Sequence, residues 1–285
     1  MVTTHRSPGS SADGKAGSAG SGGVAAEALE AGGLRLHQDG QVVTVTLDRP
    51  STRNSQTPAT WHALRSIGDS LGPEVRVVVV RGAGETFSSG LDRRMLEPGG
   101  LPGEPPLLAL LDLPDDELAA RIGTWQEAFT WLRRPDVITV AAVRGAAVGA
   151  GFQLALACDL RVLATDARFS MREPMLGLVP DLTGTKQLVD LVGYSRALEI
   201  CATTRWVSAE EAAEIGLATI VVPPEELDDA VTDLVAALTQ PVRGAVEETK
   251  ALLQSASRLC LDDQRLAERE AQVRRFRELA TPGGQ

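Results

Sequence analysis

Two glycine-rich turns are the places where this 285-residue sequence could do chemistry. The first covers residues 81–92 (RGAGETFSSGLD), and the second covers residues 144–153 (RGAAVGAGFQ). Glycine permits sharp bends and lets a ligand come close to the backbone. The second turn leads into the apolar run FQLALA, which predicts a buried helix, and the first turn of a helix carries unpaired N–H groups. A carbonyl oxygen directed there would be polarised as negative charge develops on it.

The same glycines also have a purely structural explanation, which is tight packing of a helix against a sheet. Taken alone, the turns leave both explanations open. Neither turn is a Walker A loop, because the Lys-Ser/Thr pair is missing. Neither is a dinucleotide-binding turn, because Gly149-x-Gly151 lacks a third glycine three residues later.

Both turns follow segments that predict strands buried on both faces, as in a parallel sheet. These segments are 75–80 (VRVVVV) and 137–143 (VITVAAV), and 160–163 predicts a third strand. The other predicted elements are a hairpin over 34–47 turning at Asp39-Gly40, a helix capped by Thr57-Pro58, a loop over 97–114, a helix over 115–132, a capping box at Ser208 and Glu211, and helices over 243–257 and 262–279. The fold class is therefore α/β with a helical C-terminal section.

The composition of the chain indicates a folded protein and argues against nucleic-acid binding and a membrane span. A hydrophobic content of 43% and a charged content of 23% predict a sizeable core, and the formal net charge of -10 disfavours nucleic-acid binding. No apolar run is long enough to cross a membrane, and the N-terminus lacks the apolar region of a secretory signal. Residues 1–33 are rich in Gly, Ser and Ala, which predicts a disordered leader outside the fold.

The number and spacing of the cysteines and histidines argue against disulfides, a metal site and a Ser-His-Asp hydrolase. The three cysteines are widely spaced and form no CxxC, so we expect neither a disulfide framework nor a metal site, and we expect a reducing, cytoplasmic location. The three histidines, His5, His37 and His62, lie far in sequence from both turns. A Ser-His-Asp hydrolase would therefore lack its base.

Five segments together resemble the crotonase, or enoyl-CoA hydratase/isomerase, superfamily. The resemblance covers residues 34–222 in the right order, and its motifs are LDRP with RNS at 47–55, FSSGLD at 87–92, AAVRGAAVGAGFQLALACD at 141–159, FSMREPMLGLVPDLTGTKQ at 169–187, and the stretch 206–217. It implies a ClpP-like spiral of ββα units over residues 34–241. It also implies a helical trimerisation section over 242–285, and a homotrimer or a dimer of trimers.

The resemblance also implies an acyl-CoA thioester as substrate, with coenzyme A as part of that substrate rather than a separate cofactor. The family's oxyanion hole, a pair of backbone N–H groups, falls on Leu91 and Ala150. The positions expected to bind the substrate or its CoA part are Arg53, Ser89, Gly90, Asp92 and Gly149.

The carboxylates depart from the hydratase pattern. Hydratases of this family use two glutamates, of which the first falls on Gln153 and the second on Glu173. Glutamine cannot carry a proton at neutral pH. A third position, an acid in related dienoyl-CoA isomerases, falls on Asp181, which is equally well explained as a turn residue.

We therefore expect double-bond isomerisation by Glu173, since a double-bond shift needs one base whereas hydration is easiest with two carboxylates. The alternatives are enoyl-CoA hydration assisted by Gln153, and a catalytically weakened homologue that binds acyl-CoA.

Overall fold

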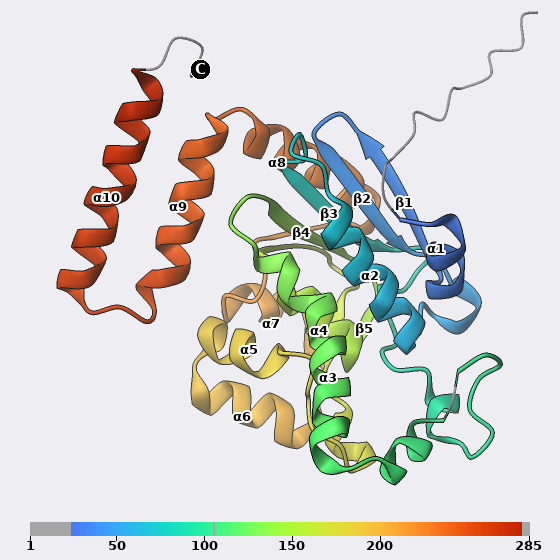
Figure 1. Ribbon diagram of the computed structural model, residues 1–285. Helices are drawn as coiled ribbons and strands as arrows, with labels where there is room; N and C mark the ends of the chain where they lie inside the picture. Colours follow the sequence, from blue (N-terminus) through green and yellow to red (C-terminus); the bar gives the residue numbers. More distant parts are fainter. Residues whose placement is uncertain (1–23, 105, 281–285) are drawn as a thin grey trace, which may run out of the picture.

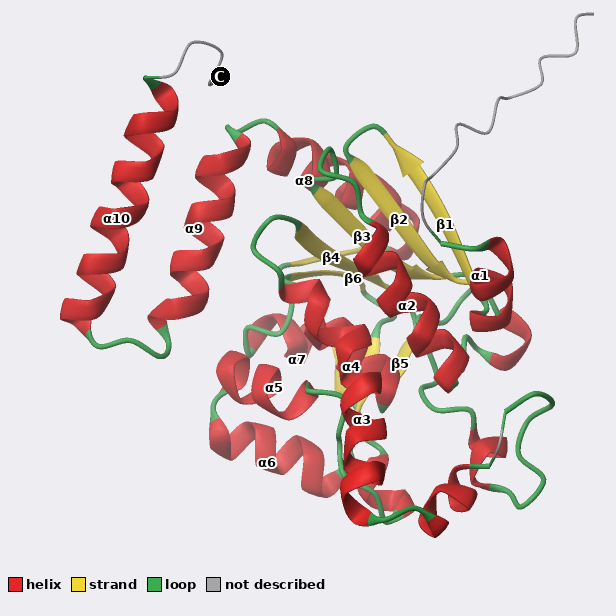
Figure 2. Ribbon diagram, in the orientation of Figure 1, coloured by secondary structure: helices red, strands yellow, loops and turns green. Residues whose placement is uncertain are grey.

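The computed structural model describes residues 24–104 and 106–280. A sheet of six strands lies at its centre, in the order β1-β2-β3-β4-β6-β9. Figure 2 labels β1, β2, β3, β4 and β6 of this sheet. β1 and β2 are antiparallel, and every later neighbour is parallel. The bounds of these strands are β1 Leu34–Asp39, β2 Val42–Leu47, β3 Val77–Gly82, β4 Ile138–Val143, β6 Leu160–Ala164 and β9 Ile220–Val222. The predicted hairpin and the three predicted buried strands are confirmed.

A smaller sheet carries the second glycine turn. It consists of β5 Ala146–Val148, β7 Arg168–Ser170 and β8 Val207–Ser208, in the order β5-β7-β8. β5 therefore interrupts the junction that the sequence predicts to run directly from β4 into the buried helix.

Helices cover both faces of the large sheet, so its strands are apolar on both sides. In β3, Val78 and Val80 face the main core, whereas Val77 and Val79 face α8. Figure 1 shows α8 behind the sheet, with α2, α3 and α4 on the opposite side.

The helices are α1 Ala26–Gly32, α2 Pro58–Ser70, α3 Asp115–Thr130, α4 Ala150–Ala157, α5 Gly184–Val192, α6 Tyr194–Thr203, α7 Ala209–Glu214, α8 Leu227–Thr239, α9 Arg243–Ala256 and α10 Leu261–Leu279. Within the described residues, no helix has the length and apolarity needed to span a membrane.

Two sequence predictions need correction. The fold does not start at Leu34, because α1 lies within the expected leader and packs its Gly32 against Ala63 of α2; residues 1–23 lie outside the described residues. The capping box at α7 is half formed. The Ser208 hydroxyl accepts from the Glu211 N–H, but the Glu211 carboxylate pairs with Arg205 instead of the N-cap backbone.

The C-terminal hairpin of α9 and α10 stands beside the body (Figure 1). Lys250 of α9 connects it to the body, since its Nζ donates to the Val137 carbonyl at 2.6 Å and to Asp159 Oδ2 at 2.7 Å. Both side chains are almost buried, at 10% and 15% exposure. The same carboxylate oxygen accepts from the Thr139 backbone N–H at 2.8 Å.

Replacing Lys250→Met should lower the free energy of unfolding by about 3 kcal/mol, because Asp159 would remain buried without its cation. The control is Arg274→Met, which breaks the more exposed pair with Glu248 and should cost less than about 1 kcal/mol. Urea unfolding measures both. Equal losses would show that the Lys250 pair contributes no more than a surface pair.

Candidate active site

The two glycine turns touch each other. Ser88 N–H donates to the Ala146 carbonyl at 3.0 Å, and Val148 N–H donates to the Ser88 carbonyl at 2.9 Å. Gly90 then passes directly over β5 with a φ of 80°. A Cβ at this position would overlap the Val148 carbonyl oxygen and would lie 3.2 Å from the Ala150 nitrogen. Only glycine therefore allows the turns to come this close.

The amides of Leu91 and Ala150 both point away from the surrounding hydrogen-bond ladders. The Gly90 carbonyl accepts from Gln56 N–H at 2.7 Å, so in a planar trans peptide the Leu91 N–H points the opposite way. The Gly149 carbonyl accepts from Gln153 N–H at 2.9 Å, so the Ala150 N–H points out of the N-terminus of α4. In the described residues neither amide has an acceptor. The two donors are thus free beside one cavity; their role as an oxyanion hole remains a prediction.

This cavity has a volume of about 760 Å³. Eight of the ten predicted site residues line it, namely Arg53, Ser89, Leu91, Gly149, Ala150, Gln153, Glu173 and Asp181. Gly90 and Asp92 do not, although Gly90 shapes the wall through its contact with β5. Much of the remaining wall is apolar and comes from the expected loop 97–114, from α3 and from the segment after Glu173; it includes Leu107, Leu110, Leu111, Leu118, Ile122, Trp125, Met175, Leu178, Val179 and Leu182.

Glu173 begins the 3-10 helix η5 (Glu173–Leu176) and lies against the second turn. A Cβ at Gly149 would lie 3.2 Å from its Oε1, which places the carboxylate beside the Ala150 amide. Oε1 accepts from Gln153 Nε2 at 2.6 Å. Oε2 is buried and has no hydrogen-bond partner in the described part of the chain. Burial raises the pKa of this carboxyl, and the charge of Asp181 raises it further.

Gln153 is held by the backbone before α5. Its Oε1 accepts from Leu182 N–H at 2.9 Å and from Gly184 N–H at 3.2 Å. Two donors at this end identify it as the oxygen, so the amide NH₂ must face Glu173. Gln153 therefore orients the Glu173 carboxylate and has no proton to exchange.

Asp181 lies in the same cavity wall, on the loop before α5. Its backbone carbonyl accepts from Gln126 Nε2 of α3 at 2.7 Å, which fixes the loop against that helix. Burial raises the pKa of the Asp181 carboxyl. The cavity thus holds two carboxyl groups that ionise less readily than exposed ones.

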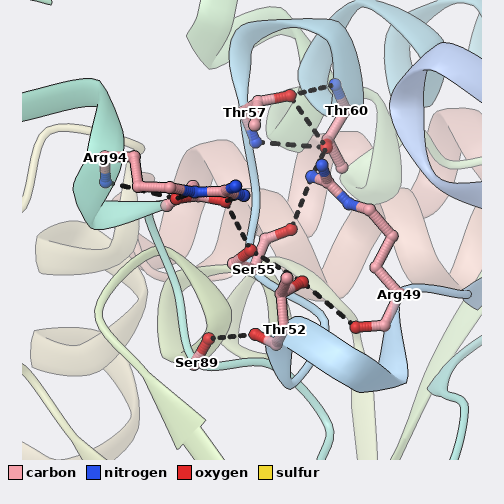
Figure 3. A network of polar contacts seen from close by, with 8 residues as sticks. Arg49, Thr52, Ser55, Thr57, Thr60, Ser89 and Arg94 are labelled. Carbon is pink, nitrogen blue, oxygen red and sulfur yellow. Dashed lines mark hydrogen bonds and ion pairs between the residues drawn. The ribbon is translucent and has the colours of Figure 1, made fainter. Parts of the chain in front are cut away.

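The expectation that Asp92 contacts substrate is wrong, because its side chain is directed into the protein. Arg94 donates to both of its oxygens at 2.9 and 2.7 Å, and the Ser55 hydroxyl donates at 3.0 Å. These contacts lower the pKa of the Asp92 carboxyl to about 2, with the Arg94 hydrogen bond as the largest cause. Figure 3 shows this network, in which Arg94 extends toward Ser55, and Ser89 donates to the loop at Thr52. Asp92 therefore stabilises the position of the segment that carries the Leu91 N–H.

The cavity-lining residues that sequence reasoning missed include Arg168, Arg172 and Trp206. Arg172 directly precedes Glu173, so its sequence position was one available signal. Trp206 lies 34 residues beyond Arg172 and reaches the site only because β8 pairs with β7. The spacing of Arg172 and Trp206 in the sequence therefore does not predict that they lie in one site.

The sequence model of the enoyl-CoA hydratase/isomerase family matches residues 37–281. A peroxisomal Delta(3,5)-Delta(2,4)-dienoyl-CoA isomerase from Arabidopsis thaliana is 32% identical over 77% of this chain and 80% of its own length. An (E)-benzylidenesuccinyl-CoA hydratase from Thauera aromatica is 32% identical over 76% of this chain and 80% of its own length. The chain therefore belongs to the enoyl-CoA hydratase/isomerase family.

Solved structures agree on the fold. A Thermobifida fusca YX protein, provisionally described as an enoyl-CoA hydratase and crystallised with CoA, has a TM-score of 0.86 and 48% identity over 92% of this chain and 99% of its own. A second Thermobifida fusca YX structure, in complex with acetoacetyl-CoA, also has a TM-score of 0.86, at 50% identity over 89% of this chain and 98% of its own. The predicted crotonase fold is confirmed.

Gly90→Ala should lower the free energy of unfolding by at least 3 kcal/mol and separate the two amides, because the new methyl group overlaps the Val148 carbonyl. The control is Gly40→Ala in the turn between β1 and β2, where φ is 54° but nothing lies within 4 Å of the added Cβ; it should cost about 1 kcal/mol. Thermal unfolding of both variants separates overlap from backbone strain. Equal destabilisation would show that the turns do not need this close contact.

Proposed function

We propose that this chain is an enoyl-CoA isomerase, which moves a carbon–carbon double bond within an acyl-CoA thioester. The observation that carries the proposal is that Glu173 shares one cavity with two free backbone donors and lies against Gly149, while its partner is an amide that exchanges no proton. One base suffices for a double-bond shift, because the proton it takes from one carbon can be returned to another.

In the proposed reaction, the thioester carbonyl oxygen accepts hydrogen bonds from the Leu91 and Ala150 N–H groups. These donors acidify the neighbouring C–H, and each contributes about 3 kcal/mol to the stability of the enolate. Glu173 removes a proton from the carbon next to the thioester, and the resulting dienolate spreads its charge toward the distal carbon. Reprotonation at that carbon by Glu173 gives the isomer and restores the carboxylate. If a protonated Asp181 supplies the proton instead, Glu173 must pass its proton back to Asp181 before the next turnover.

The CoA part would enter along the turn residues, with Arg53, Ser89 and Gly149 in contact with it. The relatives crystallised with CoA and with acetoacetyl-CoA support this assignment. We also propose that α9 and α10 bind further copies of the chain, giving a trimer or a dimer of trimers. Large exposed apolar side chains on this hairpin support that assembly, among them Leu253, Leu261, Val273 and Phe276.

Hydration is the second candidate, and the hydratases among the relatives favour it. It requires a group that orients water opposite Glu173. Gln153 is poorly suited, because its carbonyl oxygen already accepts two backbone N–H groups and its NH₂ faces Glu173. A third candidate, a homologue that binds acyl-CoA without turnover, is disfavoured by the buried free oxygen of Glu173.

Ultraviolet absorbance with a 3-enoyl-CoA and with crotonyl-CoA tests the proposal. Isomerisation should increase the absorbance of the conjugated enoyl thioester from the 3-enoyl substrate, whereas hydration would decrease it from crotonyl-CoA. Glu173→Gln should lower kcat at least about 100-fold, because the base is lost, with little change in CoA affinity. Glu225→Gln, an exposed carboxylate on η6 (Pro224–Glu226), is the control. Full activity of Glu173→Gln would contradict the assignment.

Gln153→Glu should shift the pH profile. Because burial raises the pKa of Glu173, the acid limb of kcat/KM should lie above the range of an ordinary glutamate. A second carboxylate within hydrogen-bond distance would favour a shared proton and raise the apparent pKa. The limb should therefore move to higher pH by about one unit. Gln254→Glu, whose amide contacts the Arg133 carbonyl, adds the same charge elsewhere; an equal shift in both variants would contradict pairing between positions 153 and 173.

A further inference from the structure

Two arginines of the cavity wall stack on one tryptophan. The guanidinium carbon of Arg168 lies 4.4 Å from the centroid of the Trp206 ring, and that of Arg172 lies 5.1 Å from it. Arg168 begins β7 and Trp206 directly precedes β8, so the pairing of these two strands brings the side chains together. Stacking on an aromatic face restrains a guanidinium and leaves its N–H edge available for a carboxylate.

This arginine pair has no carboxylate partner among the described residues. Arg172 donates to Met175 Sδ at 3.0 Å, and Arg168 has no side-chain hydrogen bond or ion pair. The pair is not the counter-ion of Glu173, whose carboxylate accepts from Gln153 instead. In a chain with a net charge of -10, two neighbouring cations without a counter-ion indicate a place for an external anion.

The arginine pair lies on the side of the cavity where the proposed reaction places the acyl group. Arg172 directly precedes Glu173, the residue that takes a proton from an acyl carbon in that reaction. Its contact with Met175 also puts Arg172 against the apolar wall, which continues in Leu178 and Val179. An anion bound by the pair would therefore belong to the acyl group, beyond the reacting carbons.

A plain hydrocarbon chain does not suit this part of the wall. Arg168 is exposed and Arg172 is half-buried, so water reaches both side chains. An apolar chain laid over them would remove that water from two cations and offer no hydrogen bond in return, which is unfavourable. A carboxylate at the same place replaces the water with charge-assisted hydrogen bonds, which are stronger than neutral ones.

We propose that Arg168, Arg172 and Trp206 bind a carboxylate of the acyl group, so that the substrate is the CoA thioester of an unsaturated dicarboxylic acid. This inference rests on the proposed function, because it takes the acyl group of a CoA thioester as the ligand. The thioester carbonyl lies at the two backbone amides, the acidified C–H faces Glu173, and the distal carboxylate accepts from the two guanidinium groups. Trp206 holds these cations together against their mutual repulsion.

Two thioesters of equal chain length test the proposal. 3-Hexenedioyl-CoA ends in a carboxylate, whereas 3-hexenoyl-CoA ends in a methyl group, and the absorbance of the conjugated product follows the isomerisation of both. The wild type should have a kcat/KM at least about 10-fold higher for the diacid, because the charge-assisted hydrogen bonds form with that substrate alone. 3-Octenedioyl-CoA and 3-octenoyl-CoA repeat the comparison at a longer reach. No preference for the diacid at either length would overturn the inference.

The double variant Arg168→Gln/Arg172→Gln assigns the preference to the arginine pair. Its kcat/KM for the preferred diacid should fall at least about 10-fold, and that for the matching methyl-ended thioester should stay within about twofold. An equal loss for both thioesters would also overturn the inference, because the arginines would then contact the CoA part that the two share. Arg144→Gln is the matched control, since Arg144 pairs with Asp166 and does not line the cavity; it should keep the wild-type preference.

Two further measurements separate the subsite from the reaction and from folding. If the wild type isomerises none of these thioesters, the proposed function fails, and isothermal titration then tests the subsite alone. A lower Kd for the diacid in the wild type that disappears in the double variant would support the subsite, whereas equal Kd values in the wild type would reject it. Circular dichroism checks that the variants fold, and the wild-type comparison stands without them.

Discussion

The approach of Gly90 to β5 is the contact on which the site depends. The chain has no room there for a Cβ between the two turns, and this closeness brings the Leu91 and Ala150 amides to one cavity. The direction of each N–H is fixed by the carbonyl of the same peptide group. The Gly90 carbonyl accepts a hydrogen bond from Gln56 N–H, and the Gly149 carbonyl accepts one from Gln153 N–H, so the Leu91 and Ala150 N–H groups point the opposite way. The donors are thus directed by surrounding backbone ladders, and no reorganisation is needed to point them at an oxygen.

Rigidity at this point comes from polar contacts behind the cavity. Asp92 follows Leu91 and is clamped between Arg94 and Ser55 (Figure 3). The carboxylate is almost fully buried, and its low pKa reflects stabilisation that is present above about pH 4 and lost as the pH falls toward 2. Arg49 extends the network, since its guanidinium donates to the Ser55 carbonyl and to the Thr60 hydroxyl at the start of α2. The first turn is therefore anchored to the helix that follows the hairpin.

Sequence patterns predicted the parts of the fold with strong local signals. The β-branched run ending at Val80 gave a parallel strand, and Thr57-Pro58 gave the start of α2. The second sheet was missed because strands of two or three residues, such as Val207–Ser208, are too short to show a period. Helix α1 was missed because its alanine-rich composition resembles the preceding leader, whereas contact with Ala63 fixes its position. Asp92 was misassigned because a motif locates a segment but not the direction of a side chain, which here depends on Arg94 and Ser55.

The glutamine beside Glu173 changes what the second carboxyl position can do. An amide oxygen satisfies the two N–H groups at Leu182 and Gly184 without adding a negative charge. A carboxylate in that place would face Glu173 at hydrogen-bond distance, which favours a proton shared between the two groups. With an amide, ionisation of Glu173 is opposed mainly by its own burial, and it is favoured by backbone hydrogen bonds at Glu173 and Arg172 and by the Nε2–H donor of Gln153. The remaining carboxyl, Asp181, lies elsewhere in the wall and is itself reluctant to ionise because it is buried. The site therefore pairs its buried carboxyl with an amide and keeps the second carboxyl close enough for its charge to oppose ionisation of Glu173.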